Sequence, residues 1–382
     1  MLKHHYFILT LLFFWLTPIN ANTDATPPLV TSTPLEYAQQ LNFHSNILNS
    51  TESLNIYLPS AFHETSDEHS YPVIFANDAH GSRFFLTLAG VVKHLGELDR
   101  MPESIVVSLN SGGHIPDLYK NTMWGGKPHE KIPAYGDPQK YIQHIQLELL
   151  PYLQKHYRAS NYSTIIGIST SSIFPLYALT QQPDVFDAYV FLAAHDIIGM
   201  GYEAGDTLIN AIKKIFSTPK PNTLLYFAVA DNDAYREPIY TKNIEQFEST
   251  LGKLKKNGLH SKIQIFPNER HYDAFIKTLL GAFEMQFPED DWAPKYRDLI
   301  ALPGNAMDNI DAYYQQLSAD YAVTVLPKGD RWNSVNSLRW ISGQLQRETR
   351  IAEAIEVTQR WLKYRPKSQQ AKEKLAELQN LL

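Results

Sequence analysis

The chain has 382 residues, of which 44% are hydrophobic and 19% are charged, a composition typical of globular proteins. Its 34 Lys and Arg residues against 40 Asp and Glu residues give a net charge of −6, so neither nucleic acid nor an anionic membrane surface is an expected partner. Cysteine is absent, which excludes disulfides, a thiol nucleophile and cysteine-ligated metal centres.

The N-terminus has the pattern of a secretory signal peptide. Lys3 provides the basic start, residues 6–16 form an apolar run too short to span a bilayer, and Ala21 is a small residue at the expected cleavage point. We therefore expect residues 1–21 to be removed from a periplasmic or secreted protein that has no later membrane span. The alternative is an uncleaved anchor. Residues 22–39, rich in Thr and Pro, are expected to form a flexible lead-in.

Residues 40–290 alternate between short apolar runs and amphipathic stretches. Seven of the runs have the length and composition of strands: 54–58, 73–76, 105–109, 164–168, 189–192, 224–229 and 263–266. Stretches between them carry helical stripes, for example Ile142, Ile145, Leu149 and Leu153. Strands that alternate with helices predict an α/β domain with a mostly parallel sheet covered on both faces. In such sheets the chemistry lies at the carboxyl ends of the strands.

Residues 305–382 have no strand pattern and are expected to be helical throughout. Part of this tail has the spacing of a tetratricopeptide-like (TPR-like) repeat, with large, large, small, large, small and proline at Leu338, Ile341, Ser342, Leu345, Ala354 and Pro366. A generic helical hairpin is the alternative. Because a single repeat cannot bury its own faces, we expect it to pack on the sheet domain or on neighbouring helices. A protein contact through the tail stays open.

The strongest chemical motif is Gly167-Ile-Ser169-Thr-Ser171, between a strand candidate and a helix candidate. A strand that turns sharply into a helix at a serine is a nucleophile elbow, and the residues two before and two after that serine must be small. Gly167 and Ser171 meet this demand. The helix N-terminus directs N–H groups and a partial positive charge at the serine oxygen. The motif predicts Ser169 as a nucleophile, with a Ser/Thr-rich helix cap as the alternative.

The nucleophile needs a general base, and several histidines lie on loops after strand candidates. His271 follows the last strand candidate, and others follow earlier ones: His80, His114 and His195. In α/β-hydrolases the triad runs serine, acid, histidine along the chain. This order favours His271 as the base.

The same order places the acid in the loop after the strand candidate 224–229. Asp233 is the first choice, Asp231 is the alternative and Glu237 is a distant third. The acid has to orient the imidazole and stabilise its charged form. An acidic turn is the other interpretation of this loop. A calcium loop is disfavoured because no glycine or later glutamate completes the pattern.

An oxyanion hole needs two backbone N–H donors. We expect one from Thr170 and the other from the loop after the strand candidate 73–76, at Ala79 or His80. Further loop residues are expected to line a pocket: His80, His114, Trp124 and His195. The sequence has no phosphate-binding loop, dinucleotide fingerprint or His-Glu-x-x-His motif, so no metal or organic cofactor is expected.

Together these segments resemble the putative esterase family of the α/β-hydrolases, which includes esterase-D-like, feruloyl-type and enterochelin esterases. The resemblance spans residues 40–285 and is most specific at 167–187, where the elbow and its helix lead into a Pro-Asp-x-Phe-Asp turn. It implies an α/β-hydrolase fold with Ser169 as nucleophile and His271 as base. It also implies an acid in the loop 231–233.

Several positions depart from the family pattern. Ser171 and Ser172 stand where the family has a glycine pair, and Ala79 replaces the glycine of its Asp-Gly loop. Residues 193–195 are Ala-Ala-His in place of Ser-Pro-Ser, and an arginine that the family often has near His114 is missing. These changes leave the expected triad in place but leave the substrate open.

The sequence therefore predicts a secreted serine esterase that hydrolyses a small-molecule or acyl-ester substrate through an acyl-enzyme. Two alternatives remain at this point. One is a hydrolase fold without activity that binds a partner through its helical tail. The other is an acyltransferase that uses the same triad.

Overall fold

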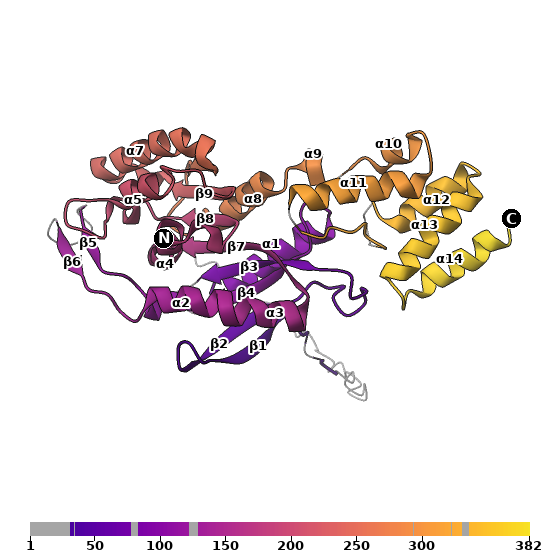
Figure 1. Ribbon diagram of the computed structural model, residues 1–382, viewed down its shortest axis with the longest axis horizontal. Coiled ribbons are helices and arrows are strands. Elements are labelled where there is room, and N and C mark those ends of the chain that lie inside the picture. Colours follow the sequence, from indigo (N-terminus) through magenta and orange to yellow (C-terminus); the bar gives the residue numbers. More distant parts are fainter. Residues whose placement is uncertain are drawn as a thin grey trace, which may run out of the picture. The chain divides into compact units, whose positions relative to one another are not determined.

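Eight strands form one sheet in the order β1-β2-β4-β3-β7-β8-β9-β10 (Figure 1). The β1–β2 and β2–β4 pairs are antiparallel, and every pair from β4 to β10 is parallel. The strands are β1 (Gln39–Ser45), β2 (Ser50–Tyr57), β3 (Tyr71–Asn77), β4 (Ile105–Leu109), β7 (Ala159–Ile168), β8 (Ala188–Leu192), β9 (Thr223–Ala230) and β10 (Leu259–Phe266). A separate antiparallel pair joins β5 (Leu118–Lys120) to β6 (Glu130–Ile132). The mostly parallel α/β sheet expected from the sequence is confirmed.

The computed structural model describes residues 31–33, 35–77, 83–121, 129–292, 294–321, 323–330 and 336–382. Of these, the residues from Tyr37 to Leu382 belong to one compact unit. The expected signal peptide, Ala79, His80 and Trp124 lie outside the described residues. Within the described ranges, no helix is long and apolar enough to cross a membrane.

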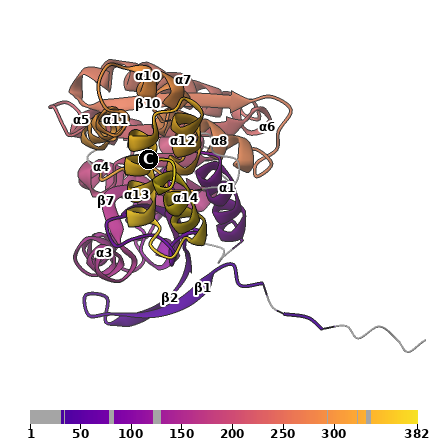
Figure 2. The same cartoon turned by 90° about the vertical axis from the view of Figure 1, so that its right-hand side faces the viewer.

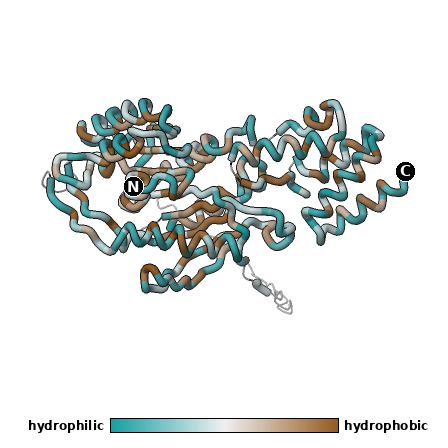
Figure 3. The backbone as a smooth tube through the Cα atoms, viewed as in Figure 1, coloured by the Kyte–Doolittle hydropathy of each residue, from teal (hydrophilic) through white to brown (hydrophobic). Residues whose placement is uncertain are grey.

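The parallel strands are apolar along most of their length because helices cover both faces of the sheet. All seven residues of β3 are buried, and Figure 3 shows hydrophobic stretches concentrated in the central strands. One core forms under α2 (Pro138–His144), α3 (Leu150–Tyr157), α4 (Ile173–Gln181), α5 (Leu208–Ile215) and α7 (Pro238–Leu254). The other forms under α1 (Phe85–Glu97) and α8 (Phe275–Gln286). Short helices α6 (Asp231–Ala234) and α9 (Glu289–Trp292) follow β9 and α8.

The predicted stripe at Ile142, Ile145, Leu149 and Leu153 is fully buried, but it does not lie on one regular α-helix. A π-helical turn, Ile145–Leu149, separates α2 from α3. Pro151 lies at the start of α3. Proline has no N–H to give to the preceding turn, and a wider turn is one way for a helix to continue past it.

The C-terminal tail contains α10 (Tyr296–Ala301), α11 (Ala306–Asp320), α12 (Leu338–Arg347), α13 (Ile351–Tyr364) and α14 (Gln369–Gln379), which share a core (Figure 2). Ser342, the small position of the predicted repeat, is buried, and its hydroxyl lies 2.6 Å from that of Thr358 on α13. The expectation of helix throughout 305–382 was wrong for residues 323–330, which have no regular secondary structure. Pro327 and Gly329 in this segment disfavour a helix.

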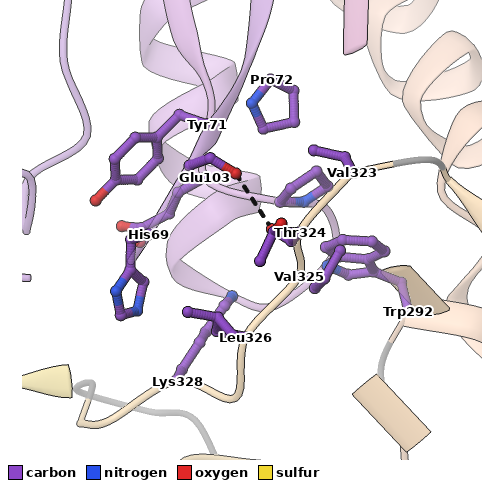
Figure 4. A pocket seen from close by; sticks show the side chains of 12 residues that line it. His69, Tyr71, Pro72, Glu103, Trp292, Val323, Thr324, Val325, Leu326 and Lys328 are labelled. Atoms are coloured by element: carbon purple, nitrogen blue, oxygen red, sulfur yellow. Dashed lines mark hydrogen bonds between the residues drawn. The ribbon is translucent and has the colours of Figure 1, made fainter. Parts of the chain in front are cut away.

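Residues 323–330 lie against the sheet domain. Lys328 Nζ contacts the carboxylate of Asp99, which follows α1, and donates to Gly96 O in the last turn of α1 at 3.1 Å. Val323 is part of the core under α1 and α8. Between this segment and the start of β3 lies a cavity of about 50 Å³, whose lining side chains include His69 and Trp292 (Figure 4). The tail thus packs on the sheet domain, as expected for helices that cannot bury their own faces.

Candidate active site

Ser169 lies at the carboxyl end of β7, where the strand enters the 3₁₀ turn Ser169–Ser172 and then α4. Its φ of 51° is left-handed, a conformation that costs a non-glycine residue energy and that a nucleophile elbow requires. A Cβ atom on Gly167 would lie 2.8 Å from Ser172 Cα and 3.2 Å from Pro175 Cγ. Glycine is therefore needed at 167 because the helix returns so close to the strand.

Ser171, which stands where the resembling family has glycine, ties the turn together. Its hydroxyl accepts a hydrogen bond from Ile168 N at 2.9 Å and donates one to Ile168 O at 2.7 Å. The side chain is buried and points back at the strand end, so it does not occupy the space in front of Ser169. The substitution of glycine by serine is thus compatible with the elbow. Thr170, the expected oxyanion donor, is half-buried in the same turn.

Asp233 and His271 are brought together from the ends of two neighbouring parallel strands. Asp233 lies on α6 after β9, His271 lies on the loop after β10, and His271 Nδ1 is 2.6 Å from Asp233 Oδ2. Burial raises the pKa of the Asp233 carboxyl, but the hydrogen bond and charge of His271 outweigh burial, so this pKa lies below its usual range. An ionised carboxylate requires the proton on Nδ1, which leaves Nε2 as an acceptor.

The three predicted triad residues follow β7, β9 and β10, so they share one edge of the sheet. Among the described residues, Asp233 and His271 are hydrogen-bonded, whereas no hydrogen bond joins Ser169 Oγ to His271. Contacts of this kind are often long in hydrolases without substrate.

The other two acids of the loop do not contact the imidazole. The carboxylate of Asp231 accepts hydrogen bonds from the backbone N–H groups of Asn268 and Glu269, at 2.8 and 3.3 Å. Glu237 is exposed and precedes the first residue of α7. Of the three candidates, only Asp233 therefore has the geometry to orient His271.

His195, expected in the pocket, is a buried imidazole beside His271. Only 1% of the residue is exposed. Its ring centroid lies 6.3 Å from that of His271 and 4.8 Å from that of Tyr240. Neither ring nitrogen has a hydrogen-bond partner among the described residues. Burial lowers the pKa of His195 to about 4 and outweighs the opposing charge of Asp233. The ring is therefore neutral near pH 7.

His114, the other pocket candidate that the structure describes, is held by contacts with residues of α2 and its N-cap. Its ring stacks on Tyr141 with centroids 4.7 Å apart, and its Nδ1 accepts a hydrogen bond from Asp137 N at 3.2 Å. Burial lowers the pKa of His114. These contacts fix the loop after β4 to the start of α2.

Two residues near the site were not singled out from the sequence. Asn77, the last residue of β3, donates from Nδ2 to Ser171 O at 2.6 Å, and its Oδ1 accepts from Ser111 N at 3.4 Å. Arg236 Nη1 lies 3.9 Å from Asp233 Oδ1. A buried polar residue at the end of a parallel strand is a usable signal for Asn77. The spacing of three from Asp233 is the only sequence signal for Arg236.

The described residues contain no group of three or more His, Asp or Glu side chains placed to hold a metal ion. The Asp233–His271 pair lies at the same edge of the sheet as Ser169, whose backbone is left-handed. A serine and such a pair can carry nucleophilic chemistry, in which the histidine removes the hydroxyl proton.

Several solved protein structures share the fold of this chain. No curated protein is significantly similar in sequence. An IroE-like serine hydrolase from Shewanella oneidensis has a TM-score of 0.61 at 17% identity, covering 90% of this chain and 100% of that chain. An uncharacterised protein from Capnocytophaga ochracea has a TM-score of 0.53 at 16% identity, covering 90% and 89%. Siderophore hydrolase EstA from Aspergillus nidulans has a TM-score of 0.50 at 14% identity, covering 68% and 99%.

The sequence itself matches a family model. The model described as Putative esterase matches residues 45–286, from the end of β1 to the end of α8. This span is more than half of the chain and contains the serine elbow, the acid loop and the histidine loop. The chain therefore belongs to the Putative esterase family and is a carboxylic ester hydrolase.

Proposed function

We propose that the protein hydrolyses carboxylic esters through an acyl-enzyme formed on Ser169. His271 Nε2 removes the proton from Ser169 Oγ as the oxygen attacks the ester carbonyl. The same nitrogen then gives the proton to the leaving alcohol, and a water molecule releases the acid in a second, equivalent step. Asp233 holds the imidazole in the required tautomer and stabilises its cation. The N–H of Thr170 is one proposed donor to the oxyanion, and Ala79 N–H is the proposed second donor.

The observation that carries this proposal is the 2.6 Å contact between His271 Nδ1 and Asp233 Oδ2. Asp233 is buried, with 5% of its side chain exposed, so its charge is poorly screened and acts strongly on the adjacent ring. A buried carboxylate that is hydrogen-bonded to an imidazole activates a hydroxyl nucleophile in serine hydrolases. Here the pair lies at the sheet edge that also holds Ser169 in the left-handed backbone conformation of a nucleophile elbow.

Labelling with a fluorophosphonate probe tests the proposal directly. The wild type is expected to be labelled and to hydrolyse p-nitrophenyl acetate, whereas Ser169→Ala abolishes both and His271→Ala lowers both by at least about 10³-fold. Ser172→Ala is the matched control, because Ser172 lies in the same turn and its hydroxyl has no hydrogen-bond partner in the part of the chain that the structure describes. This variant is expected to keep the wild-type labelling.

Failure of a well-folded wild type to react with the probe would overturn the proposal and favour a hydrolase fold without activity. Labelling without hydrolysis, together with ester products when alcohols are added, would point to acyl transfer instead. Both outcomes use the same protein sample, so the three functions are separated in one series of measurements.

We also propose that the enzyme works outside the cytoplasm after loss of residues 1–21. The basic start, the short apolar run and Ala21 support this assignment. Mass spectrometry of the protein from its native host is expected to give a mature chain that begins at residue 22. A chain that keeps residues 1–21 would contradict the cleavage and favour the anchor.

A further inference from the structure

Two carboxylates two residues apart, Asp231 and Asp233, both reach the histidine loop, but they hold different parts of it. Asp233 holds the imidazole ring. We propose that Asp231 is a positioning residue that fixes the backbone of the loop and so sets where the ring of His271 stands. This inference rests on the proposed role of His271 as the general base.

The contact of Asp231 is with two consecutive backbone amides. Oδ2 accepts from Asn268 N at 2.8 Å, and Oδ1 accepts from Glu269 N at 3.3 Å. Both carboxylate oxygens are therefore engaged. Asn268 has a φ of 59°, and successive N–H groups around a left-handed residue form a concave site for an anion. The carboxylate of Asp231 occupies this site.

The sheet brings these groups together. β9 and β10 are parallel neighbours, and their last residues, Ala230 and Phe266, are partners in the register. Asp231 is the first residue after β9, and Asn268 is the second residue after β10. Both acids lie on the short helix α6, where residues two apart do not face the same side, so that Asp231 meets the backbone at 268–269 and Asp233 meets the ring at 271.

The left-handed backbone at Asn268 costs energy that the surrounding structure must supply. Charge-assisted hydrogen bonds to a carboxylate are about twice as strong as neutral ones, so Asp231 is well suited to hold this turn. The first and largest cause of its lowered pKa is the bond from Asn268 N, which indicates that the carboxylate is ionised when it holds the loop. Without it, the backbone three residues before the base is free to shift.

Displacement of a catalytic group by about 1 Å can cost as much as 10²-fold in rate. We therefore expect Asp231→Ala to lower kcat for p-nitrophenyl acetate by about 10- to 100-fold with little change in KM. Fluorophosphonate labelling should slow by the same factor. The acidic limb of the pH profile of kcat/KM should stay at its wild-type position, because the Asp233–His271 pair is intact.

Three further variants sharpen the test. Asp231→Asn keeps one acceptor oxygen and is expected to recover part of the lost rate. Asp233→Asn removes the charge beside the ring and is expected to move the acidic limb of the profile. Asp273→Asn is the matched control, because Asp273 is an exposed acid of the same loop that accepts from Arg270 Nε at 2.7 Å. Its kcat should match the wild type.

A wild-type kcat in folded Asp231→Ala, or in Asp231→Asn if the alanine variant does not fold, together with a lowered melting temperature would overturn the inference and leave Asp231 a purely structural acid. A shift of the acidic limb in Asp231→Asn but not in Asp233→Asn would overturn it in the other direction, by making Asp231 the acid of the triad. An unreactive wild type would instead refute the proposed function.

Discussion

Of the eight non-glycine residues with a left-handed backbone in the described part of the chain, three lie at the carboxyl edge of the sheet. Ser169 follows β7, Ala193 follows β8 and Asn268 follows β10, with φ values of 51°, 58° and 59°. Each such residue costs about 1–2 kcal/mol. Their conformations persist because hydrogen bonds hold them, such as the bond from Ala193 N to Ala228 O at 2.9 Å. At the scale of single residues, part of the backbone strain of this fold therefore lies at the edge where we propose the chemistry.

His195 gives a prediction about pH and stability. Its folded-state pKa of about 4 lies below the ordinary histidine value of 6.5. Between these two values the unfolded chain binds a proton at His195 that the folded chain does not bind. The contribution of His195 is therefore fully present above about pH 6.5 and is lost as the pH falls toward 4. We expect the free energy of unfolding of His195→Phe to fall less steeply over this window than that of the wild type.

Urea denaturation at pH 7, 6 and 5 measures the two slopes. His94→Phe is the control, because it removes an exposed imidazole on α1 and leaves the buried one in place. Equal slopes for His195→Phe and the wild type would show that burial does not hold the ring neutral.

At the scale of the elements, the elbow is fixed to the neighbouring strand by a side chain. Asn77 pairs with Gly167 in the β3–β7 register, and its amide group joins Ser171 O to Ser111 N. One residue thus connects the ends of β3, β4 and β7. Because it is buried, both of its partners lose a hydrogen bond if it is removed, and water does not readily replace it.

We expect Asn77→Ala to lower the free energy of unfolding by about 1–3 kcal/mol, the cost of leaving buried polar groups without partners. Labelling of Ser169 by a fluorophosphonate should also slow, because the turn that presents the serine is no longer fixed to β3. Asn161→Ala provides the comparison, since Asn161 is an exposed amide that accepts from Gln154 at 2.8 Å. A stability loss no larger than that of Asn161→Ala would contradict the prediction.

At the scale of the whole molecule, the tail is joined to the sheet domain by polar and apolar contacts. Ser66 N donates to Tyr364 O at 3.1 Å, and the side chain of Arg365 bonds Glu64 at 2.5 Å. Leu317 is buried in the core under α1 and α8. Removal of the tail would expose this apolar surface to water. Deletion of the tail is therefore a poor test of whether the tail binds a partner protein.

The pair Lys328–Asp99 is the most buried of the ion pairs between the tail and the sheet domain within the described residues, with 19% and 8% of the side chains exposed. Lys328→Met leaves the carboxylate without this partner, and we expect a loss of about 3 kcal/mol in the free energy of unfolding. Asp99→Asn should reduce that loss when the two are combined. A double-mutant cycle by urea denaturation gives the coupling energy.

Lys363→Met is the matched control for the tail. Lys363 pairs with Glu68 at 2.9 Å, but about half of each side chain is exposed, so the expected change is below about 1 kcal/mol. Additive effects of the Lys328 and Asp99 substitutions would show that this buried pair does not join the tail to the sheet.

The sequence by itself indicated seven of the eight strands of the sheet and the loops after them, whereas the edge strand β1 was not among the strand candidates. Apolar runs such as 73–76 and 105–109 lie within observed strands because a strand buried on both faces has to be apolar along its length. The small residue Gly167 before Ser169 pointed to a sharp turn, since a side chain there collides with the following helix. These constraints act between residues that are close in sequence, so the local sequence pattern reveals them.

Tertiary structure alone decided which acid meets His271. Asp231 and Asp233 lie on one short helix, and their order along the chain does not show which of them faces the ring and which faces the backbone. The roles of Asn77 and His195 likewise depend on strands distant in sequence that lie side by side. Only the packing of β3, β7, β8, β9 and β10 sets those distances, because hydrogen bonds and burial depend on groups that the chain brings together from far apart.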